Sequence, residues 1–418
     1  MTIKIINYTV YFINSDRARY GSRSGRAPQT KSTRTMNFQP RPHLTTVDPR
    51  PPFDCIALLL QGGGALGAYQ GGVYEALAEV NIHPDWIAGI SIGAINAAII
   101  AGNPPNSRVD RLREFWTQVT LDAPFTGLMN SDHTRNFLNQ VNASFAAVFG
   151  ASGFFSARPL APWIQAGGTP AATSIYDTGA LKTTLERLVD FDRINAGMTR
   201  FSAGAVNVRT GNLVYFDTAT HTIRPEHILA SGALPPGFPA VEIDGEHYWD
   251  GGLVSNTPLQ YVIECGDRQD TLVFQVDLWS ARGQIPRNMA DVVTRQKEIQ
   301  YSSRTRASTD QFKSLHRLQR ELAALLSRLP EDLREQEDVR LLRTAASHNV
   351  HSLVHLIYRA RDYEGHSKDY EFSRLSMQDH WRAGYHDALR TLRHPEVLAR
   401  PTSADGVSTF DLEQDGRE

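Results

Sequence analysis

A serine between two glycines is the residue of this chain best placed to act as a nucleophile. It stands in Gly89-Ile90-Ser91-Ile92-Gly93, after a short apolar run at 86–88 and before a longer one at 94–101. These flanks predict a buried strand, a sharp turn and a buried helix, which is the arrangement of a nucleophile elbow. The positive N-terminal end of that helix favours negative charge developing near the serine oxygen. The pattern therefore predicts an activated Ser91.

A second glycine cluster follows the apolar run 55–60, which has the length of a buried strand. In Gln61-Gly62-Gly63-Gly64-Ala65-Leu66-Gly67 the glycines separate this strand from a segment with apolar residues at helical spacing. Three uses fit this arrangement. Gly62, Gly64 and Gly67 match a dinucleotide-binding fingerprint. Alternatively, bare backbone N–H groups stabilise an oxyanion, or the glycines only permit a tight turn.

The dinucleotide interpretation requires an acidic residue about 20 positions further on, at the end of the second strand, to bind a ribose. The candidate is Asp85, which precedes that strand, whereas the end of the strand is occupied by Ser91. A nucleotide site has no need of a serine elbow at this place. We therefore favour the oxyanion interpretation and keep a nucleotide-binding module as a minor alternative.

Asp250-Gly251-Gly252 is the third motif, and it follows the hairpin signal Asp244-Gly245 and a short strand. Alone, such a tripeptide is most often a turn. With the glycine loop and the serine motif before it in this order, the chain resembles the patatin-like phospholipases, in particular bacterial ones with a helical C-terminal extension. The resemblance covers about residues 55–263 and includes the segment Ala230-Ser231-Gly232-Ala233-Leu234-Pro235-Pro236-Gly237-Phe238-Pro239 and an expected strand at 201–208.

The resemblance implies a three-layer α/β/α fold with a central, mostly parallel sheet. It also implies a Ser–Asp dyad for acyl-ester hydrolysis, in which Ser91 is the nucleophile, Asp250 the general base and an acyl-serine the intermediate. Such a base must be buried, because a carboxylate with an ordinary pKa of about 3.9 takes a proton from an alcohol poorly. The oxyanion hole is expected at Gly62, Gly63, Gly64 and Ile92, and the other motif glycines are Gly67, Gly89, Gly93, Gly251 and Gly252. No metal ion and no organic cofactor is expected.

One position departs from the family pattern. The glycine loop of the family usually carries Arg or Lys where this chain has Leu66. Backbone donors do not depend on that side chain, so the expected oxyanion hole is retained. The attraction that such a cation would have for an anionic head group is absent.

A conventional triad with a histidine base is the mechanistic alternative. Hydrolases with this serine motif place the histidine after the acid, so the candidates are His316, His355, His366 and His380. None of them has a distinctive local setting. His247 lies three residues before Asp250 on the same expected strand, and its side chain therefore points to the opposite face.

The composition is that of an ordinary globular protein, with 418 residues, a formal net charge of −2, and 41% hydrophobic and 21% charged residues. A nearly neutral chain has no electrostatic footprint for nucleic acid, so no nucleic-acid partner is expected. Cys55 and Cys265 are predicted to be buried beside core strands, which favours a reducing compartment and a cytoplasmic protein. No apolar run reaches the roughly 18 residues that a membrane-spanning helix needs.

Shifts in composition divide the chain into four parts. Residues 1–50 are basic and rich in Ser, Thr and Pro, so we expect a disordered tail, with a basic arm for anionic membranes as the alternative. Residues 55–263 form the catalytic domain, whose sheet is expected to continue to about residue 280. Residues 285–399 are expected to be a mostly helical extension, and 400–418 a polar, disordered tail.

Aromatic residues gather between positions 104 and 173. We expect them to belong to a cap that lines an acyl-chain channel, with plain core packing as the alternative; they are Phe137, Phe145, Phe149, Phe154, Phe155 and Trp163. The sequence thus predicts a hydrolase of (lyso)phospholipid acyl esters in peripheral contact with a membrane. The alternatives are a carboxylesterase or thioesterase for other acyl esters, and a non-catalytic lipid- or nucleotide-binding module.

Overall fold

The computed structural model describes residues 50–121, 132–266, 269–302, 305–330, 333, 336–361 and 364–412, with 132–134 and 305–309 described by their backbone alone. These residues belong to the unit formed by positions 44–418. The expected basic tail lies outside the described residues, apart from Arg50.

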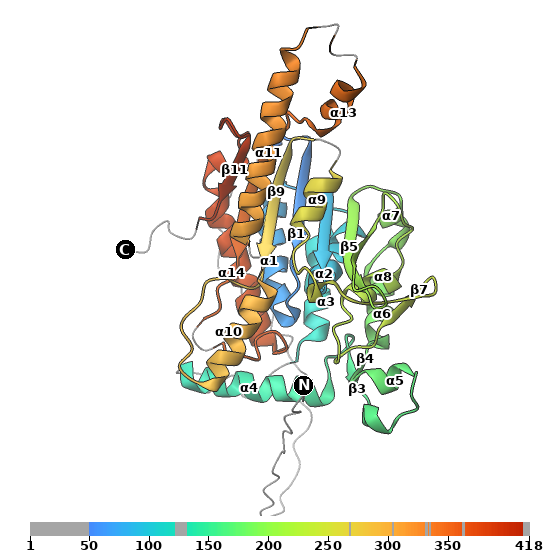
Figure 1. Ribbon diagram of the computed structural model, residues 1–418. Helices are drawn as coiled ribbons and strands as arrows, with labels where there is room; N and C mark the ends of the chain where they lie inside the picture. Colours follow the sequence, from blue (N-terminus) through green and yellow to red (C-terminus); the bar gives the residue numbers. More distant parts are fainter. Residues whose placement is uncertain are drawn as a thin grey trace, which may run out of the picture. The chain divides into compact units, whose positions relative to one another are not determined.

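A nine-stranded sheet in the described part of the chain provides the frame for the site (Figure 1). Its order is β11-β10-β9-β1-β2-β5-β8-β7, and β6 pairs with β5. β11, β10, β9, β1, β2 and β5 run parallel, whereas β6, β7 and β8 are antiparallel to their neighbours. The strands are β1 (Cys55–Leu60), β2 (Trp86–Ile90), β5 (Arg200–Asn207), β6 (Leu213–Asp217), β7 (Val241–Ile243), β8 (Glu246–Asp250), β9 (Thr271–Asp277), β10 (His351–Ile357) and β11 (Val407–Phe410). A separate small sheet pairs β3 (Ser156–Ala157) with β4 (Tyr176–Asp177).

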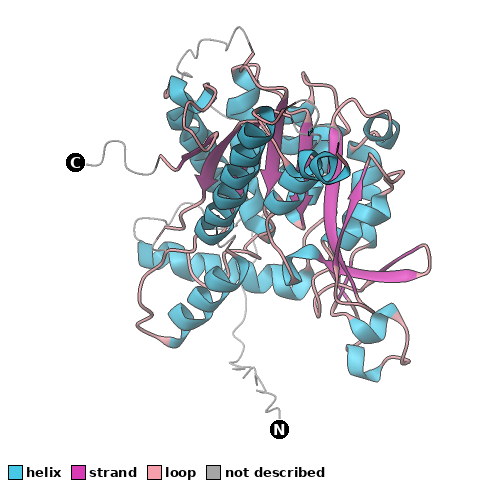
Figure 2. Cartoon of the chain, turned by 45° about the horizontal axis from the view of Figure 1, so that its top comes forward, coloured by secondary structure: helices cyan, strands magenta, loops and turns pink. Residues whose placement is uncertain are grey.

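Helices cover both faces of the main sheet (Figure 2). They are α1 (Ala68–Glu79), α2 (Ile92–Ala101), α3 (Arg108–Val119), α4 (Asp132–Phe149), α5 (Pro170–Thr173), α6 (Gly179–Leu188), α7 (Phe191–Asn195), α8 (Pro225–Ser231), α9 (Leu259–Cys265), α10 (Met289–Tyr301), α11 (Thr305–Ser327), α13 (Glu337–Ala345) and α14 (Arg374–Leu392). The larger core cluster joins the sheet to α1, α2, α3, α6 and α14, and a second cluster joins it to α9 and α11. This is the expected three-layer α/β/α fold.

The apolar runs at the centre of the sheet explain this layering. Every residue of β1 and β9 is buried, which is typical of parallel strands covered on both faces. Along β1, Leu58 and Leu60 pack into the larger core cluster, while Leu59 packs into the second one. Such alternation follows from the two-residue period of a strand.

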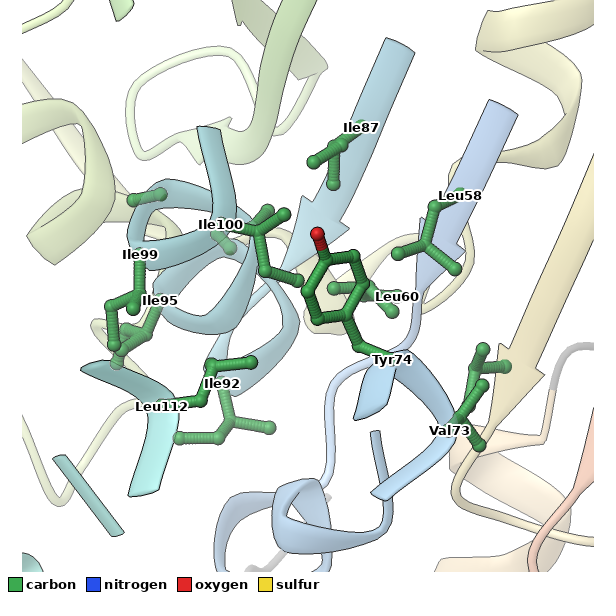
Figure 3. Close-up of a cluster of buried hydrophobic side chains, with 14 of the residues drawn as sticks. Leu58, Leu60, Val73, Tyr74, Ile87, Ile92, Ile95, Ile99, Ile100 and Leu112 are labelled. Carbon is green, nitrogen blue, oxygen red and sulfur yellow. The ribbon is translucent and has the colours of Figure 1, made fainter. Parts of the chain in front are cut away.

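α2 is apolar all round, and all ten of its residues are buried. A helix of this kind is stable only inside a core. Figure 3 shows isoleucines of α2, among them Ile95 and Ile100, gathered with Leu60 of β1 and Tyr74 of α1. The helix that follows the candidate nucleophile is therefore held rigidly by its surroundings.

The C-terminal third differs from the expected mostly helical extension with a disordered tail. β10 pairs in parallel with β9, and β11 pairs in parallel with β10, so residues 351–357 and 407–410 enlarge the central sheet. β11 lies within the segment 400–418 that was expected to be disordered. β11 has only four residues and lies in a polar stretch, so the sequence alone does not indicate a strand there. Residues 413–418 lie outside the described residues.

Other local expectations have mixed outcomes. The strand expected at 201–208 is β5, and Asp244 and Gly245 have positive φ angles of 52° and 85°, as a tight hairpin turn requires. Cys55 is buried, but Cys265 at the end of α9 is exposed, which corrects the expectation for that residue. Among the helices that the structure describes, none is both long and apolar enough to cross a bilayer.

Candidate active site

Ser91 occupies a sharp turn between β2 and α2. Its backbone angles, φ 54° and ψ −124°, lie in a region that residues other than glycine rarely adopt. Its N–H donates to Ser231 Oγ at 3.0 Å, and the Ser231 hydroxyl donates to the Gly204 carbonyl at 2.7 Å. At Gly93 a side chain is excluded, because a Cβ there would lie 2.1 Å from the carbonyl oxygen of Leu60. The elbow is thus held by its neighbours on three elements.

The register of the sheet brings Asp250 next to Ser91. At the end of β2, Ile90 pairs with Gly204 of β5. Along the same edge of β5, the next residue, Ala205, pairs with Asp250 at the end of β8. β8 therefore meets β5 where β2 stops, and the two motifs meet although they are far apart in the sequence.

Burial sets the protonation of Asp250. The residue is 2% exposed, and burial raises the pKa of its carboxyl group to about 7. Hydrogen bonds from the Ser91 hydroxyl and from the Gly252 N–H, the latter at 2.7 Å, oppose this rise by stabilising the carboxylate. Near neutral pH the group can therefore both accept and return a proton.

The glycine loop lies beside this pair, and side chains fix its first residue. The Gly62 carbonyl accepts hydrogen bonds from Asn256 Nδ2 at 2.9 Å and from Trp279 Nε1 at 3.0 Å. The Gly62 N–H donates to the Asn256 carbonyl at 3.4 Å. Within the described part of the chain, the N–H groups of Gly63 and Gly64 donate to no backbone or side-chain acceptor. These two groups are the better candidates for an oxyanion.

The C-terminal extension supports the same loop. The Asp369 carbonyl accepts from the Ala65 N–H at 2.8 Å, and the Asp369 carboxylate is bound by Lys297 Nζ at 2.8 Å. Gly64 has φ +56°, and a Cβ there would lie 2.1 Å from the Asp369 carbonyl oxygen. Residues of α10 and of the loop before α14 therefore determine how the glycine loop is held.

A cavity of about 460 Å³ opens onto Ser91 and Asp250. It is lined by Gly62, Gly63, Gly64, Ser91, Ile92, Ile95, Ala147, Phe154, Phe155, Tyr176, Gly232, Leu234, Pro235, Pro236, Gly237, Phe238, Asp250, Gly252, Asn256, Trp279, Tyr301, Asp369, Tyr370 and Phe372. Most of these residues are apolar or aromatic. Among these described residues there is no histidine, lysine or arginine. The cavity is thus suited to a long apolar group with one reactive polar end.

Sequence reasoning missed part of this lining. Tyr301, Asp369, Tyr370 and Phe372 come from the C-terminal extension, and Trp279 follows β9. The extension carried no motif that would have pointed to the site. Tyr370 and Phe372 flank Glu371, and such an aromatic pair in an otherwise polar stretch is the one local sign of a buried surface there.

The predicted aromatic cap is only partly present at the cavity. Phe154 and Phe155 are buried, line the cavity and contact Phe238 and Phe372. The other four aromatics of the prediction are exposed at the surface; they are Phe137, Phe145, Phe149 and Trp163. They therefore do not line an acyl-chain channel in this structure.

The candidate histidines lie elsewhere. His316 Nδ1 is 2.8 Å from the Asp405 carbonyl, His355 is buried on β10, and His380 is buried 3.5 Å from Glu364. The backbone carbonyl of His366 accepts from Lys297 Nζ at 3.2 Å. None of the four lines the cavity. The arrangement favours a dyad over a triad.

The remaining alternatives also lose support. Asp85 accepts a hydrogen bond from the Ile56 N–H at 2.8 Å, at the start of β1, whereas the glycine loop follows the end of β1. It therefore cannot bind a ribose beside that loop. Leu66 is buried in the core cluster. Among the residues described, no group of three or more His, Cys, Asp and Glu is arranged to hold a metal ion.

Comparison with known proteins places these observations in a family. Residues 58–263 match the family model of the patatin-like phospholipases, and residues 299–404 match a second model described as patatin phospholipase. A putative patatin-like phospholipase domain-containing protein of Caenorhabditis elegans, M110.7, is 36% identical over 64 residues, which are 15% of this chain and 6% of that protein. Patatin-like phospholipase domain-containing protein 7 of Rattus norvegicus is 42% identical over 65 residues, 16% of this chain and 5% of that protein.

The chain thus spans only a small part of the length of these curated relatives. Among solved structures, VipD from Legionella pneumophila aligns with 81% of this chain and 67% of its own, at 16% identity and a TM-score of 0.38. The two family models together cover the glycine loop, the serine elbow, the Asp250 turn and most of the C-terminal extension. The chain belongs to the patatin-like phospholipase family.

Proposed function

We propose that this protein is a serine acyl hydrolase that cleaves acyl esters of phospholipids or lysophospholipids through a Ser91–Asp250 dyad. One observation carries the proposal. A fully buried carboxyl group with a pKa near 7 is hydrogen-bonded to a serine on a strained elbow, in an apolar cavity whose described lining holds no histidine. This combination supplies a base of suitable strength without an imidazole.

In the first half of the reaction, ionised Asp250 takes the proton of the Ser91 hydroxyl as Ser91 Oγ bonds to the ester carbonyl carbon. The negative charge moves to the carbonyl oxygen. It is stabilised by the N–H groups of Gly63 and Gly64 and by that of Ile92 at the start of α2. As the intermediate collapses, the bond to the alcohol oxygen breaks, and that oxygen takes the proton from Asp250. The products are an acyl-serine and a free alcohol.

In the second half, water replaces the alcohol. Asp250 takes a proton from the water as the water oxygen bonds to the acyl carbon, and the same N–H groups stabilise the oxyanion. The bond to Ser91 Oγ then breaks, and the serine recovers its proton from Asp250. The fatty acid leaves, and the dyad is restored without any metal ion or cofactor.

The cavity suits the acyl chain better than the head group. Its aromatic walls can surround a chain, whereas its described lining offers no cationic side chain to pair with a phosphate. This observation favours, as a second candidate function, a broader esterase or thioesterase acting on acyl esters that lack phosphate. Both candidates share the same dyad and the same acyl-enzyme.

A fluorophosphonate probe tests the dyad. We expect it to label the wild type, and we expect Ser91→Ala and Asp250→Asn to abolish labelling. Asp192→Asn, which removes an exposed carboxylate on α7, is the matched control and should label normally. Labelling that survives Asp250→Asn would contradict the assignment of the base. Hydrolysis of phosphatidylcholine compared with triacylglycerol and thioesters of equal chain length then separates the two substrate classes.

A further inference from the structure

The segment 136–176 is almost free of charge. Arg158 is its only charged residue, and this side chain forms an ion pair with Asp177 at 3.2 Å. The whole chain has 21% charged residues, so a stretch of this length would ordinarily carry several more. Such a segment can be expected in a core, yet much of this one lies at the surface.

Large apolar side chains of this segment are exposed to solvent. On α4 they recur at helical spacing and so form one stripe. Phe137 is 64% exposed, Phe145 54% and Phe149 67%, and the rings of Phe145 and Phe149 lie 5.3 Å apart. In the loop between β3 and α5, Trp163 is 83% exposed. We call the exposed apolar side chains of α4 and of the loop between β3 and α5 the apolar rim; they are Phe137, Val141, Phe145, Val148, Phe149, Leu160, Trp163 and Ile164.

The segment that carries the apolar rim also lines the candidate active site. The same segment contributes Ala147, Phe154, Phe155 and Tyr176 to the cavity wall, and the Tyr176 hydroxyl donates to the Ala147 carbonyl at 2.7 Å. Figure 1 shows α4 and the β3–α5 region at the end of the sheet toward which β9 points. This is the end at which β2 leads into the serine elbow. One face of the segment thus lines the cavity, and its other face is the rim.

We propose that the apolar rim docks the protein on the surface of a zwitterionic phospholipid bilayer, so that an acyl chain passes into the cavity without crossing water. Exposed aromatic side chains around a site mark an interaction surface, and Trp and Phe are favoured at the bilayer interface. The segment 136–176 holds no lysine, and its one arginine, Arg158, is paired with Asp177, which argues against attraction to anionic lipid. This inference rests on the proposed function, since it names the source of the substrate.

Vesicle flotation with the Ser91→Ala protein measures docking without hydrolysis. We expect it to float with phosphatidylcholine vesicles, with little change at high salt. The triple variant Phe145→Ser, Phe149→Ser, Trp163→Ser should bind these vesicles on the order of a hundredfold more weakly, because three large side chains no longer enter the interface. Leu318→Ser with Leu325→Ser is the matched control. It removes two comparably exposed leucines from α11, whose far end packs on α13, and should bind normally.

Trp163 provides a readout in a protein that keeps the rim. Phosphatidylcholine with brominated acyl chains should quench part of the tryptophan fluorescence, and Trp163→Phe should lose that quenched part while still floating with vesicles. Equal flotation of the triple variant and the parent protein would overturn the proposal. Binding that requires anionic lipid and is lost at high salt would also overturn it. The same holds if the rim joins two copies of the chain in solution and the protein does not bind vesicles.

Hydrolysis of a soluble short-chain ester separates this proposal from the proposed function. With Ser91 intact, the triple variant should hydrolyse such an ester at the wild-type rate, because the rim does not touch the dyad. A protein that binds vesicles through the rim but hydrolyses no ester would contradict the dyad and support the docking surface. A protein that hydrolyses soluble esters but does not bind vesicles would support the dyad and contradict the docking surface.

Discussion

We expect this protein to lose activity as the pH falls below about 7, which is well above the pH range in which ordinary carboxyl groups titrate. In the proposed mechanism only the ionised form of Asp250 takes the serine proton, and burial raises the pKa of this carboxyl group to about 7. The folded pKa lies above the unfolded value of about 3.9, so the carboxylate already takes up a proton as the pH falls through neutrality. Activity should therefore depend on a group whose environment, rather than its chemical type, sets the working pH.

The magnitude follows from the ionised fraction. With a pKa of about 7, kcat/KM should fall about tenfold per pH unit on the acid side, and near pH 5 about 1% of the enzyme should hold the active form. A carboxyl group with an ordinary pKa would leave the same range flat. The assay is kcat/KM for a soluble short-chain p-nitrophenyl ester between about pH 5 and pH 9, which avoids any effect of pH on vesicles.

Temperature distinguishes this profile from that of a histidine base, which titrates in the same range. The pKa of a carboxylic acid hardly changes with temperature, whereas that of an imidazole falls as temperature rises. The acid limb should therefore stay in place when the profile is repeated warm and cold. A flat profile would refute the effect of burial on Asp250, and a limb that moves with temperature would refute the assignment of Asp250 as the base.

Four further changes have definite expected outcomes. Asp250→Asn should stabilise the fold against urea by as much as about 4 kcal/mol above pH 7 and by little near pH 4, because ionisation of the buried carboxyl opposes folding only as the pH rises from the unfolded to the folded pKa. Ser231→Ala removes the acceptor of the elbow N–H and should lower kcat roughly tenfold with little change in KM. Gly64→Ala should abolish fluorophosphonate labelling, because its Cβ would lie 2.1 Å from the Asp369 carbonyl. Lys297→Met frees the Asp369 carboxylate and should lower kcat roughly tenfold, with partial rescue by Lys297→Arg.

An ion pair elsewhere in the protein supplies the control for the change at Lys297. Lys182→Met breaks an ion pair with Glu226 at 2.7 Å that lies away from the cavity lining, and it should leave kcat unchanged. If it lowered kcat as much as Lys297→Met, the effect at Lys297 could not be assigned to support of the glycine loop. Equal urea stability of Asp250→Asn and wild type at every pH would contradict a buried, raised carboxyl pKa.

The residues of the expected dyad could be found in the sequence because the glycines beside each of them indicate the local backbone conformation. Gly93 is required where the elbow approaches Leu60, and Asp244-Gly245 defines the hairpin that delivers Asp250. Apolar runs such as those of β1 and α2 likewise show where the core lies, because a run of consecutive apolar residues predicts a buried element. Local patterns were sufficient for these parts.

The contribution of the C-terminal extension could not be read in the same way. Tyr301 lies at the end of a helix without a buried residue, and Asp369 acts mainly through its backbone carbonyl, which any residue possesses. β10 pairs with the free edge of β9, and β11 pairs in turn with the free edge of β10. Such roles depend on contacts between distant segments, and no local pattern records them.

The support that Asp369 gives to the glycine loop also bears on when, during synthesis, the candidate active site can be completed. A ribosome releases the chain from its N-terminus, so the serine elbow and the Asp250 turn emerge well before residue 369. Until then Ala65 lacks its hydrogen-bond acceptor, and the carboxylate partner of Lys297 does not exist. We therefore expect the proposed hydrolase to become competent only late in synthesis, after residue 369 has left the ribosome.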